Sequence, residues 1–437
     1  MRYICIMISS LFLLAAARAQ SFSGVDFSGL KQNPDLVDFV NSGEYEVPVV
    51  RELSSEPAKN SVSKAAKKDW TVMIYINAKN DLESAALVDF NEMETVGSTG
   101  RVNFVAELGR SAQFSADDGN WTGARRYLIS KDTDTTHISS PVLQSFDDVN
   151  MGDWRHLAEF MRWARQNFPA ERYALIIWNH GCGWNDAIFD DYLRPQSTRG
   201  ISLDVDAGSY IATRDMGRIF KEGGSVDLYA ADACLMQMAE ILAETEYSAN
   251  IIVGSEDVEP GDGYDYAAVF SLLAARPDMT DAELAQAITS SYASYFTPQQ
   301  KAVTMSAVNT KRIKELSVYV RDFAASLMAN ESRELVQTGI AGTLSFYVAD
   351  YKDLYDFAET MNSLSLNPAV RQASGALAGF IKDKLVYSNA TVGSDFQRAG
   401  GVSVYLPLSG YLSSYDGLPF AVETGWGEFL KWVGSGK

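Results

Sequence analysis

Cysteine and histidine, which most nucleophilic and metal-binding sites require, are scarce in this sequence. The 437-residue chain contains three of each, namely Cys5, Cys182, Cys234, His137, His156 and His180. A zinc site takes about three or four protein ligands. The histidines and cysteines are too few and too widely spaced to make a zinc enzyme the first hypothesis. The candidates for a nucleophile and a general base are therefore few.

Positive charge is also deficient. The chain has 37 Lys and Arg residues against 56 Asp and Glu residues, which gives a formal net charge of -19. So acidic a chain is a poor partner for a nucleic-acid backbone or an anionic membrane surface. We expect no nucleic-acid partner, and a cationic substrate fits this charge better. With 46% hydrophobic and 21% charged residues, the composition is that of a globular protein with one large or two medium domains.

Long hydrophobic segments are limited to one. Residues 3–17 are apolar and follow Arg2, and the small residues Ala17 and Ala19 suit a cleavage site, so we interpret residues 1–19 as a secretory signal peptide. An uncleaved anchor helix is the alternative, but a membrane span needs about 20 apolar residues. The cysteine inside the apolar segment does not suggest a lipid anchor. We expect a secreted or periplasmic protein without stable membrane insertion.

The remainder of the chain divides by composition and periodicity. Residues 20–68 are polar and mixed, and we interpret them as a linker or pro-segment. From residue 69 onward, apolar runs typical of buried strands alternate with segments of helical periodicity. The predicted strands are 70–76, 102–108, 125–129, 173–178, 226–231, 250–254, 302–308, 342–348 and 401–406, and the predicted helices are 82–96, 153–167, 235–246, 281–295, 311–328 and 354–361. This alternation predicts an α/β fold with a mostly parallel sheet covered by helices on both faces. Residues 69–270 are predicted to form the core, and residues 271–437 to complete the sheet and wall the cleft.

Reactive side chains follow two of the predicted strands. Functional residues of parallel α/β sheets gather at the carboxyl ends of the strands, and His180 and Cys234 lie directly after such ends. A cysteine that opens a helix has a lowered thiol pKa, and a nearby imidazole can take the thiol proton. The backbone N–H groups of Gly181 and Cys234 are candidates for an oxyanion hole. The alternative for each side chain is a structural role in the core.

These segments resemble the caspase-like cysteine peptidases, and specifically the clostripain family. The resemblance rests on His180-Gly181 and Asp232-Ala233-Cys234 and on four longer blocks, which are WTVMIYINAKNDL (70–82), EDVEPGDGYDY (256–266), DLYDFA (353–358) and GVSVYLP (401–407). It extends from about residue 69 to the end of the chain. It implies a caspase-like αβα sandwich with a carboxyl-terminal extension. It also implies a cysteine endopeptidase that cleaves after Arg or Lys with a Cys–His dyad.

The resemblance implies an acidic pocket for the basic residue of the substrate. Asp232, two residues before the predicted nucleophile, and Asp262 are the candidate carboxylates, since a carboxylate in a partly dry pocket selects a cation better than an exposed one. The alternatives are a helix N-cap for Asp232 and a turn residue for Asp262. Trp184 is expected either to wall the substrate cleft or to pack in the core.

Relatives in the family are often activated by self-cleavage between the histidine and the cysteine. Residues 190–208 are predicted to be a polar loop that contains Arg194 and Arg199. Proline follows Arg194, which stiffens the chain and removes an N–H, so the bond between Arg199 and Gly200 is the easier one to cleave. The alternative is an uncleaved surface loop.

No cofactor is needed for thiol chemistry, but calcium is a second expectation from the resemblance. Clostripain depends on calcium, and Asp190, Asp191, Asp204 and Asp206 offer hard oxygen ligands, although their spacing fits no EF-hand loop. Zinc binding by His180, Cys182 and Asp186 is a weaker alternative, since this set is small.

Cys182 is a departure from the family pattern, which usually has a small residue such as glycine at this position. Two cysteines in an exported chain suggest a disulfide, and a bridge between Cys182 and Cys234 would block catalysis. The rival function is thus an exported binding protein on the same fold that is catalytically silent or locked by a disulfide. The oligomeric state is not predicted.

Overall fold

The computed structural model describes residues 67–185 and 200–435, and within them the central feature is a nine-stranded sheet. In sheet order its strands are β12 (Val386–Val392), β10 (Val303–Asn309), β9 (Ala249–Gly254), β8 (Val226–Asp232), β5 (Ala170–Trp178), β1 (Lys68–Ala78), β2 (Val102–Arg110), β3 (Gly123–Leu128) and β4 (Val142–Phe146). Two small sheets accompany it, made of β6 (Gly200–Asp204) with β7 (Ser209–Ala212) and of β11 (Tyr351–Asp353) with β13 (Ser403–Tyr405).

Helices occur between most of the strands, as the periodicity predicted. They are α3 (Glu83–Val96), α4 (Trp154–Asn167), α6 (Met216–Gly223), α7 (Ala239–Glu244), α8 (Tyr266–Ala275), α9 (Asp281–Phe296), α10 (Ile313–Asn330), α11 (Arg333–Gly342), α12 (Leu354–Leu364), α13 (Pro368–Phe380), α14 (Pro419–Thr424) and α15 (Trp426–Gly434). The α/β alternation predicted from the sequence is confirmed.

The sheet is parallel at its centre and antiparallel at both margins. β9, β8, β5, β1 and β2 run parallel to one another, while β10, β12, β3 and β4 are added by antiparallel pairing. The prediction of a mostly parallel sheet therefore describes the five central strands only. Those five strands carry near-continuous apolar runs because both of their faces are covered.

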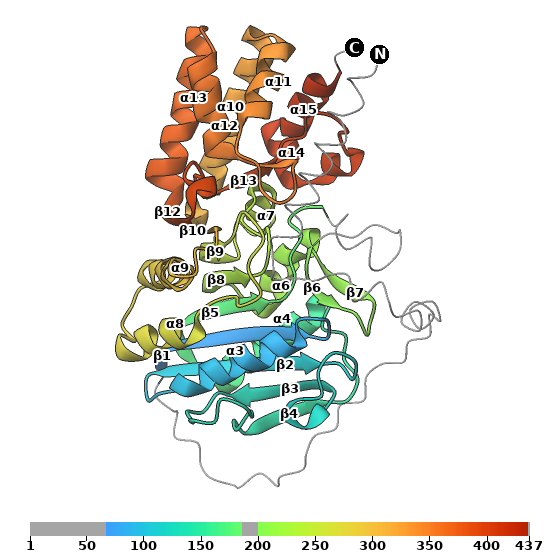
Figure 1. Ribbon diagram of the computed structural model, residues 1–437, viewed down its shortest axis with the longest axis vertical. Coiled ribbons are helices and arrows are strands. Elements are labelled where there is room, and N and C mark those ends of the chain that lie inside the picture. The colour runs from blue at the N-terminus through green and yellow to red at the C-terminus, as the bar shows by residue number, and fades with distance from the viewer. Residues whose placement is uncertain (1–66, 186–199, 436–437) are drawn as a thin grey trace, which may run out of the picture.

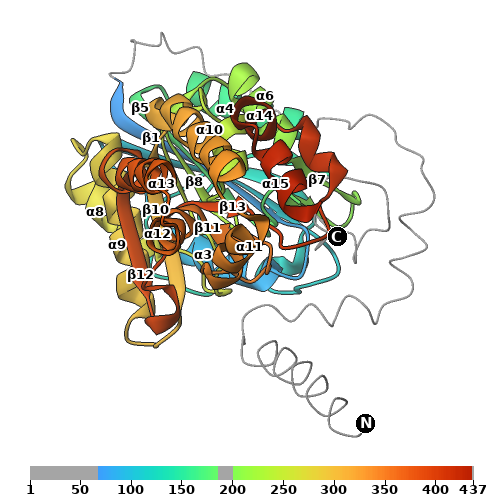
Figure 2. The same cartoon turned by 90° about the horizontal axis from the view of Figure 1, so that it is seen from above.

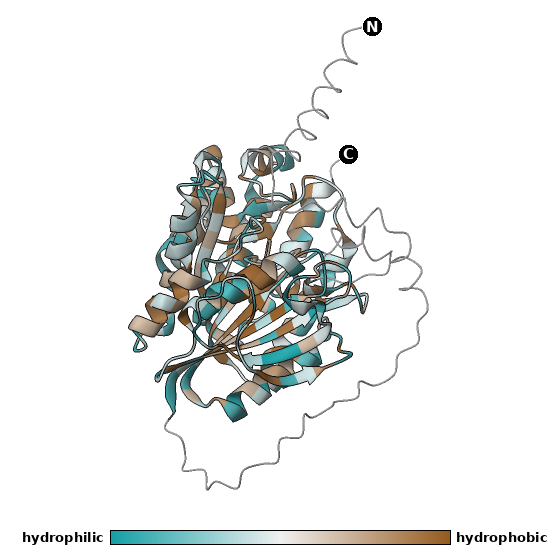
Figure 3. Ribbon diagram, turned by 60° about the horizontal axis from the view of Figure 1, so that its bottom comes forward, coloured by the Kyte–Doolittle hydropathy of each residue, from teal (hydrophilic) through white to brown (hydrophobic). Residues whose placement is uncertain are grey.

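Alternate residues of the central strands supply two separate cores. On β1, Val72, Ile74 and Ile76 belong to the core that packs under α3, α8 and α9, whereas Met73 and Tyr75 belong to the core under α4 and α6. This split follows from the two-residue period of a strand. Figure 1 shows α3 and α8 in front of the sheet and α4 behind it, and Figure 3 shows the central strands coloured as hydrophobic over most of their length.

The region after residue 270 contributes to the same sheet and then forms a helical layer. β10 and β12 extend the sheet beyond β9, and α10 to α15 gather beyond that edge of the sheet (Figures 1 and 2). The core beneath α4 and α6 continues without a break into these helices, with Phe323, Phe357 and Phe429 among its members.

Two of the predicted strands differ from the structure. Residues 343–350 form no strand, because α11 ends at Gly342 and Ser345 makes only an isolated bridge to Lys352. The apolar residues of this segment pack locally instead, with Phe346 against Phe396. The strand predicted at 401–406 shortens to β13 and pairs with β11 outside the main sheet. Among the described residues, we find no helix with the length and apolar character needed to span a bilayer.

Candidate active site

The carboxyl ends of β5 and β8 bring the two predicted reactive residues to one edge of the sheet. Trp178 and Asp232 are register partners on these parallel strands, and the backbone N–H of Asn179 donates to the carbonyl of Asp232 at 3.2 Å. His180 and Cys234 each follow two residues after this matched pair. Both side chains line one small hollow, together with Trp178, Asp232, Glu259 and Gly263.

Gly181 allows the two strand ends to approach closely. A Cβ atom at this position would lie 2.3 Å from the carbonyl oxygen of Cys234 and 3.2 Å from the Cβ of Ala233. No larger residue fits without moving the Cys234 backbone. Within the described residues, the backbone N–H groups of Gly181 and Cys234 donate to no protein acceptor. Both donors remain available, as an oxyanion hole requires.

The His180 side chain is buried and oriented. It is 3% exposed, and its Nε2 is 2.8 Å from Oδ1 of Asp81. Asp81 lies in the turn between β1 and α3. The backbone N–H of His180 donates to Oδ1 of Asn179 at 2.5 Å, and the same oxygen accepts from the N–H of Leu203 at 2.9 Å.

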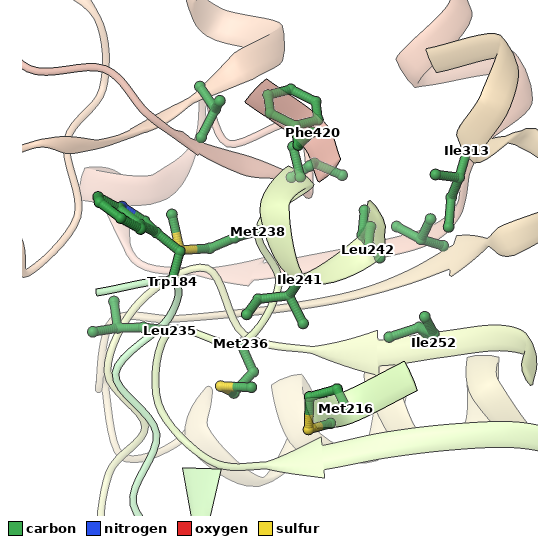
Figure 4. Packing of buried hydrophobic residues seen from close by; sticks show 14 of the residues in the cluster. Trp184, Met216, Leu235, Met236, Met238, Ile241, Leu242, Ile252, Ile313 and Phe420 are labelled. Atoms are coloured by element: carbon green, nitrogen blue, oxygen red, sulfur yellow. The ribbon is translucent and has the colours of Figure 1, made fainter. Parts of the chain in front are cut away.

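Cys234 does not open a helix, which corrects the sequence-based prediction. α7 begins at Ala239, and residues 233–238 form an irregular segment after β8. Leu235 has a φ of 64°, a left-handed conformation that is unfavourable for a bulky residue and interrupts any helix. The side chains of this segment are nevertheless buried, except that of Cys234, which is partly exposed. Figure 4 shows Leu235, Met236 and Met238 among the packed residues around Trp184.

A loop after β9 holds this irregular segment in place. The N–H of Leu235 donates to the carbonyl of Asp257 at 3.0 Å, and the N–H of Gln237 donates to the carbonyl of Ser255 at 3.0 Å. The N–H of Glu259 donates to the Cys234 sulfur at 3.2 Å. The loop at residues 255–259 therefore sets the position of the thiol.

The surroundings of Cys234 favour its neutral form. Burial, with a smaller contribution from the nearby carboxyl groups of Glu259, Asp257 and Asp232, raises the pKa of the thiol to about 12, although the N–H of Glu259 acts in the opposite direction. This is the reverse of the helix-terminus effect expected from the sequence. A thiolate at this position therefore depends on a base that accepts the proton.

Asp232 is a buried carboxylate at the base of the hollow. It is 5% exposed, and its Oδ2 accepts hydrogen bonds from the Tyr266 hydroxyl at 2.7 Å and the Tyr264 N–H at 3.4 Å. A Cβ at Gly263 would lie 3.1 Å from both carboxylate oxygens, so any larger residue at this position would crowd the carboxylate. Asp232 caps no helix, and its strand-end position corrects the alternative of an N-cap.

Glu259 forms a proton-sharing pair with Asp232. Burial raises the pKa of Asp232 to about 6, whereas hydrogen bonds from Tyr266 and Glu259 lower it. Burial and the Asp232 charge raise the pKa of Glu259 well above its usual range. Such a pair titrates as a unit, and burial disfavours the state in which both carboxyl groups are charged.

Two predicted pocket residues lie elsewhere. Asp262 is outside the lining of the hollow, has a side chain 46% exposed and pairs with Nζ of Lys301 at 2.8 Å. Its exposed loop position agrees with the alternative of a turn residue. Trp184 is fully buried and packs against Tyr405 and Tyr415, with ring centroids 4.6 Å and 4.8 Å away. Packing, and not the cleft wall, is therefore the role that the structure supports for Trp184.

Cys182 lies in a small core of its own. It is fully buried beside Leu203 and Val205, and its sulfur is 3.2 Å from the carbonyl oxygen of Gly200. In the described part of the chain, Cys182 and Cys234 form no disulfide.

The structure describes only the second part of the segment 190–208, for which a polar loop with two cleavage sites was predicted. Arg194, Arg199, Asp186, Asp190 and Asp191 lie outside the described residues. Residues 200–204 form the buried strand β6, which corrects the prediction of a polar loop up to residue 208.

Asp204, the last residue of β6, and Asp206 already have protein partners. Asp204 pairs with Lys79 at 3.6 Å and accepts the N–H groups of Met151 and Ala207, so its charge is neutralised. Asp206 accepts a hydrogen bond from Ser111 at 2.8 Å. Across residues 67–185 and 200–435, no group of three or more His, Cys, Asp or Glu side chains is arranged to hold a metal ion.

The sequence analysis missed three residues of this site, namely Asp81, Glu259 and Tyr266. Each lies within one of the sequence blocks that resemble the family, and this was the one feature of the sequence that could have pointed to them. Their roles depend on side-chain geometry, since Asp81 reaches His180 across 99 residues of sequence and Tyr266 reaches Asp232 across 34.

Comparisons with known proteins find similar chains of one family. Clostripain from Hathewaya histolytica is 26% identical over 420 residues, which cover 82% of this chain and 77% of clostripain. A secreted C11 cysteine protease from Bacteroides thetaiotaomicron, solved with an irreversible peptide inhibitor, superposes with a TM-score of 0.63 at 20% identity, covering 82% of this chain and 99% of that one. An inactive zymogen C11 protease from Parabacteroides distasonis gives a TM-score of 0.60 at 17% identity, with the same coverage.

These superpositions confirm the α/β fold implied by the resemblance. The family model described as the clostripain family, peptidase C11, matches residues 74–432. This match spans most of the described chain, including both strand ends at the hollow, so the chain belongs to the clostripain family of cysteine proteases.

Proposed function

We propose that this protein is an exported cysteine endopeptidase that cleaves peptide bonds after Arg or Lys, with Cys234 as nucleophile and His180 as general base. The observation that carries the proposal is the shared hollow, in which the two side chains lie two residues beyond a registered strand pair and beside a buried carboxylate. The family membership supplies the reaction class, and the hollow supplies the residues.

The proposed reaction proceeds in two halves. His180 takes the proton from the Cys234 sulfur, and the thiolate attacks the substrate carbonyl. The N–H groups of Gly181 and Cys234 bind the resulting oxyanion. Its collapse forms a thioester and breaks the C–N bond, and the imidazolium gives its proton to the leaving amine. A water molecule, deprotonated by His180, then attacks the thioester and releases the acid and the thiol.

The acid pair at the base of the hollow supports a preference for basic side chains. Asp232 and Glu259 place two carboxyl groups in the lining of the hollow, and a guanidinium or ammonium group of a substrate would favour their ionised forms. Burial of the pair reduces the screening of that interaction by water. A residue larger than Gly263 would crowd the Asp232 oxygens. Asp262, paired with Lys301 outside the hollow, has no part in this proposal.

Self-processing remains part of the proposal, with Arg199 preferred over Arg194. Gly200 begins β6, and its carbonyl accepts from the N–H of Cys182 at 3.3 Å. Cleavage after Arg199 would therefore place a new amino terminus at the start of a buried strand. Calcium is retained as a proposal only for residues such as Asp190 and Asp191, since Asp204 is neutralised by Lys79.

Purified variants and short fluorogenic peptides test the proposal. The peptides end in Arg, Lys or Leu before the reporter group. We expect Cys234→Ala and His180→Ala to lose turnover by about 1,000-fold or more, because each removes one member of the dyad. Asp232→Asn should lower kcat/KM for the Arg peptide relative to the Leu peptide by roughly 10- to 100-fold, the range for one charge-assisted hydrogen bond.

Asp262→Asn is the matched control, because it removes a nearby carboxylate, next to Gly263 in the chain, that lies outside the hollow. It should leave the Arg-to-Leu ratio unchanged. Intact-mass analysis of the same proteins reports self-cleavage, which Cys234→Ala should abolish. Equal turnover by the wild type and Cys234→Ala would reject the mechanism, and an Arg-to-Leu ratio that responds to Asp262 but not to Asp232 would reject the pocket.

A further inference from the structure

We propose that Asp81 is a positioning residue for His180. Its carboxylate holds the imidazole by Nε2, leaves Nδ1 as the nitrogen that accepts the Cys234 proton, and stabilises the imidazolium that results. The inference rests on the proposed function for its chemistry, and the turn that carries Asp81 supplies the geometry.

The contact between Asp81 and His180 assigns the imidazole tautomer. Nε2 of His180 is 2.8 Å from Oδ1 of Asp81. An ionised carboxylate only accepts hydrogen bonds, so Nε2 must carry the proton and donate it. The lone pair of the neutral ring is then on Nδ1, which is the only ring nitrogen able to act as a base.

Three asparagines fix the turn relative to the histidine. The Asn80 side chain donates to the carbonyl of Asn77 at 3.2 Å and to the carbonyl of Leu203 at 2.8 Å. The Asn179 side chain donates to the carbonyl of Asn77, and its oxygen accepts the N–H of His180. The Asp81 turn, the end of β5 and β6 are thus bound to one another through buried side chains. This network keeps the carboxylate within reach of the ring.

Other roles for Asp81 find no support in the described residues. The N-cap of α3 is Leu82, and no side chain caps that helix. Asp81 pairs with no Lys or Arg of the described chain, and His180 is the partner of its carboxylate. The Asp81 side chain is 22% exposed against 3% for His180. It can therefore remain charged at a modest desolvation cost while it supports a buried ring.

The charge of Asp81 matters most when the proton moves. Transfer from the Cys234 sulfur to Nδ1 breaks the S–H bond, forms an N–H bond and converts a neutral pair into a thiolate and an imidazolium. A carboxylate at 2.8 Å from Nε2 stabilises the imidazolium directly. Since burial of Cys234 disfavours the thiolate, the ion pair depends on this stabilisation, and loss of the carboxylate should raise the pH at which the thiolate forms.

The test compares Asp81→Asn and Asp81→Ala with the wild type as full-length proteins. Asparagine keeps an oxygen that can accept from Nε2 but removes the charge, whereas alanine removes both. One readout is the rate of Cys234 alkylation by iodoacetamide as a function of pH, located by peptide mass spectrometry. We expect its midpoint to move up by about one pH unit in Asp81→Asn. A second readout is turnover of an Arg peptide, for which kcat should fall roughly 10- to 1,000-fold with KM nearly constant.

Asp69→Asn is the matched control. Asp69 lies at the opposite end of the strand that leads to Asp81, has a side chain 26% exposed and pairs with Arg101 at 2.7 Å. Its removal should change neither the alkylation midpoint nor kcat. In a His180→Ala background, Asp81→Asn should have no further effect, because the carboxylate acts through the imidazole.

The outcomes separate this inference from the proposed function. If the wild type cleaves no basic peptide but the alkylation midpoint still depends on Asp81, the positioning role stands and the substrate proposal fails. If Asp81→Asn matches the wild type in midpoint and in kcat, the positioning role is overturned. It is also overturned if Asp81→Asn shifts the midpoint equally in the His180→Ala background.

Discussion

Gly181 shows how one residue can set the geometry of this site. Its missing side chain lets the end of β5 lie against the carbonyl of Cys234, where a Cβ would be 2.3 Å away. The obstructing atom belongs to the backbone and cannot rotate aside, so any larger residue must displace the cysteine segment.

We predict that Gly181→Ala lowers peptide turnover by roughly 100-fold or more and destabilises the protein by about 1–3 kcal/mol, the range for overpacking a buried site. Activity assays and urea unfolding measure the two effects. Gly375→Ala is the control, because open space surrounds that helical glycine, and it should keep full activity. If Gly181→Ala turned over peptides at the wild-type rate, the site would not depend on the close approach of the ends of β5 and β8, and the prediction would be wrong.

At the scale of single residues, the sequence predicted which residues form the site better than it predicted the surroundings of their side chains. His180 and Cys234 were placed by their positions after strands and Asp232 by the family resemblance, and the structure brings all three to one hollow. The prediction that Asp262 lies in the pocket was wrong. A residue between two glycines can direct its side chain toward the pocket or toward solvent, and the ion pair with Lys301 holds it on the outside. The thiol pKa was predicted in the wrong direction because it depends on Glu259 and on burial, neither of which follows from the local sequence.

The loop after β9 is the element on which the cysteine segment depends. Residues 255–259 accept its backbone N–H groups and donate to the Cys234 sulfur. The same loop is joined to the carboxyl-terminal region by a second buried carboxyl pair, Glu256 with Asp353, and Asp353 also accepts the N–H groups of Asp356 and Gly400.

This pair predicts a pH dependence of stability. Burial raises the pKa of Asp353 to about 6 and that of Glu256 further above its usual range, with the charge of Asp257 nearby adding to the latter. Both folded-state pKa values lie above those of the unfolded chain, so the pair stabilises the folded state at low pH. This contribution is lost as the pH rises through the folded-state values.

We therefore expect the free energy of unfolding to fall less between pH 5 and pH 8 in Glu256→Gln than in the wild type, by on the order of 1 kcal/mol. Urea titrations at the two pH values measure this difference. Glu428→Gln, which removes an exposed carboxylate beside Lys431, should follow the wild type. If the free energy of unfolding changed with pH by the same amount in Glu256→Gln and in the wild type, the proposed coupling between Glu256 and Asp353 would be contradicted.

Elements with strong periodicity were predicted well, and the failures have a common cause. The helix predicted at 235–246 begins only at Ala239, because Leu235 and Gln237 bond across to the 255–259 loop instead of along a helix. The segment at 342–348 has the apolar residues of a strand, yet the core beside it is filled by Phe396. In both places a tertiary contact overrides the local preference.

At the scale of the whole molecule, the carboxyl-terminal region is part of the catalytic fold and not an appendage. β10 and β12 extend the main sheet, and Ser403 donates to the carbonyl of Gln237 at 3.0 Å, three residues from Cys234. The order of these strands could not be predicted from the sequence, because local patterns do not encode which distant strands pair.

We predict that a chain ending at Asn309 fails to reach the native state, since it lacks β12 and the helices that cover one core. It should bind a hydrophobic dye and be digested rapidly by trypsin, while a chain ending at Ser435 should resist digestion and unfold in one thermal transition. Two separate transitions in the longer chain, or a compact and active shorter chain, would show that the regions fold independently.

The strand order also has a consequence for how the chain is made. The strand that completes the sheet ends at Val392 of a 437-residue chain, so most of the polypeptide must be synthesised before the margin of the sheet can close. Non-local pairing of this kind slows folding. A newly made chain would thus stay incompletely folded through most of its synthesis, which delays proteolytic competence until the last strand is in place.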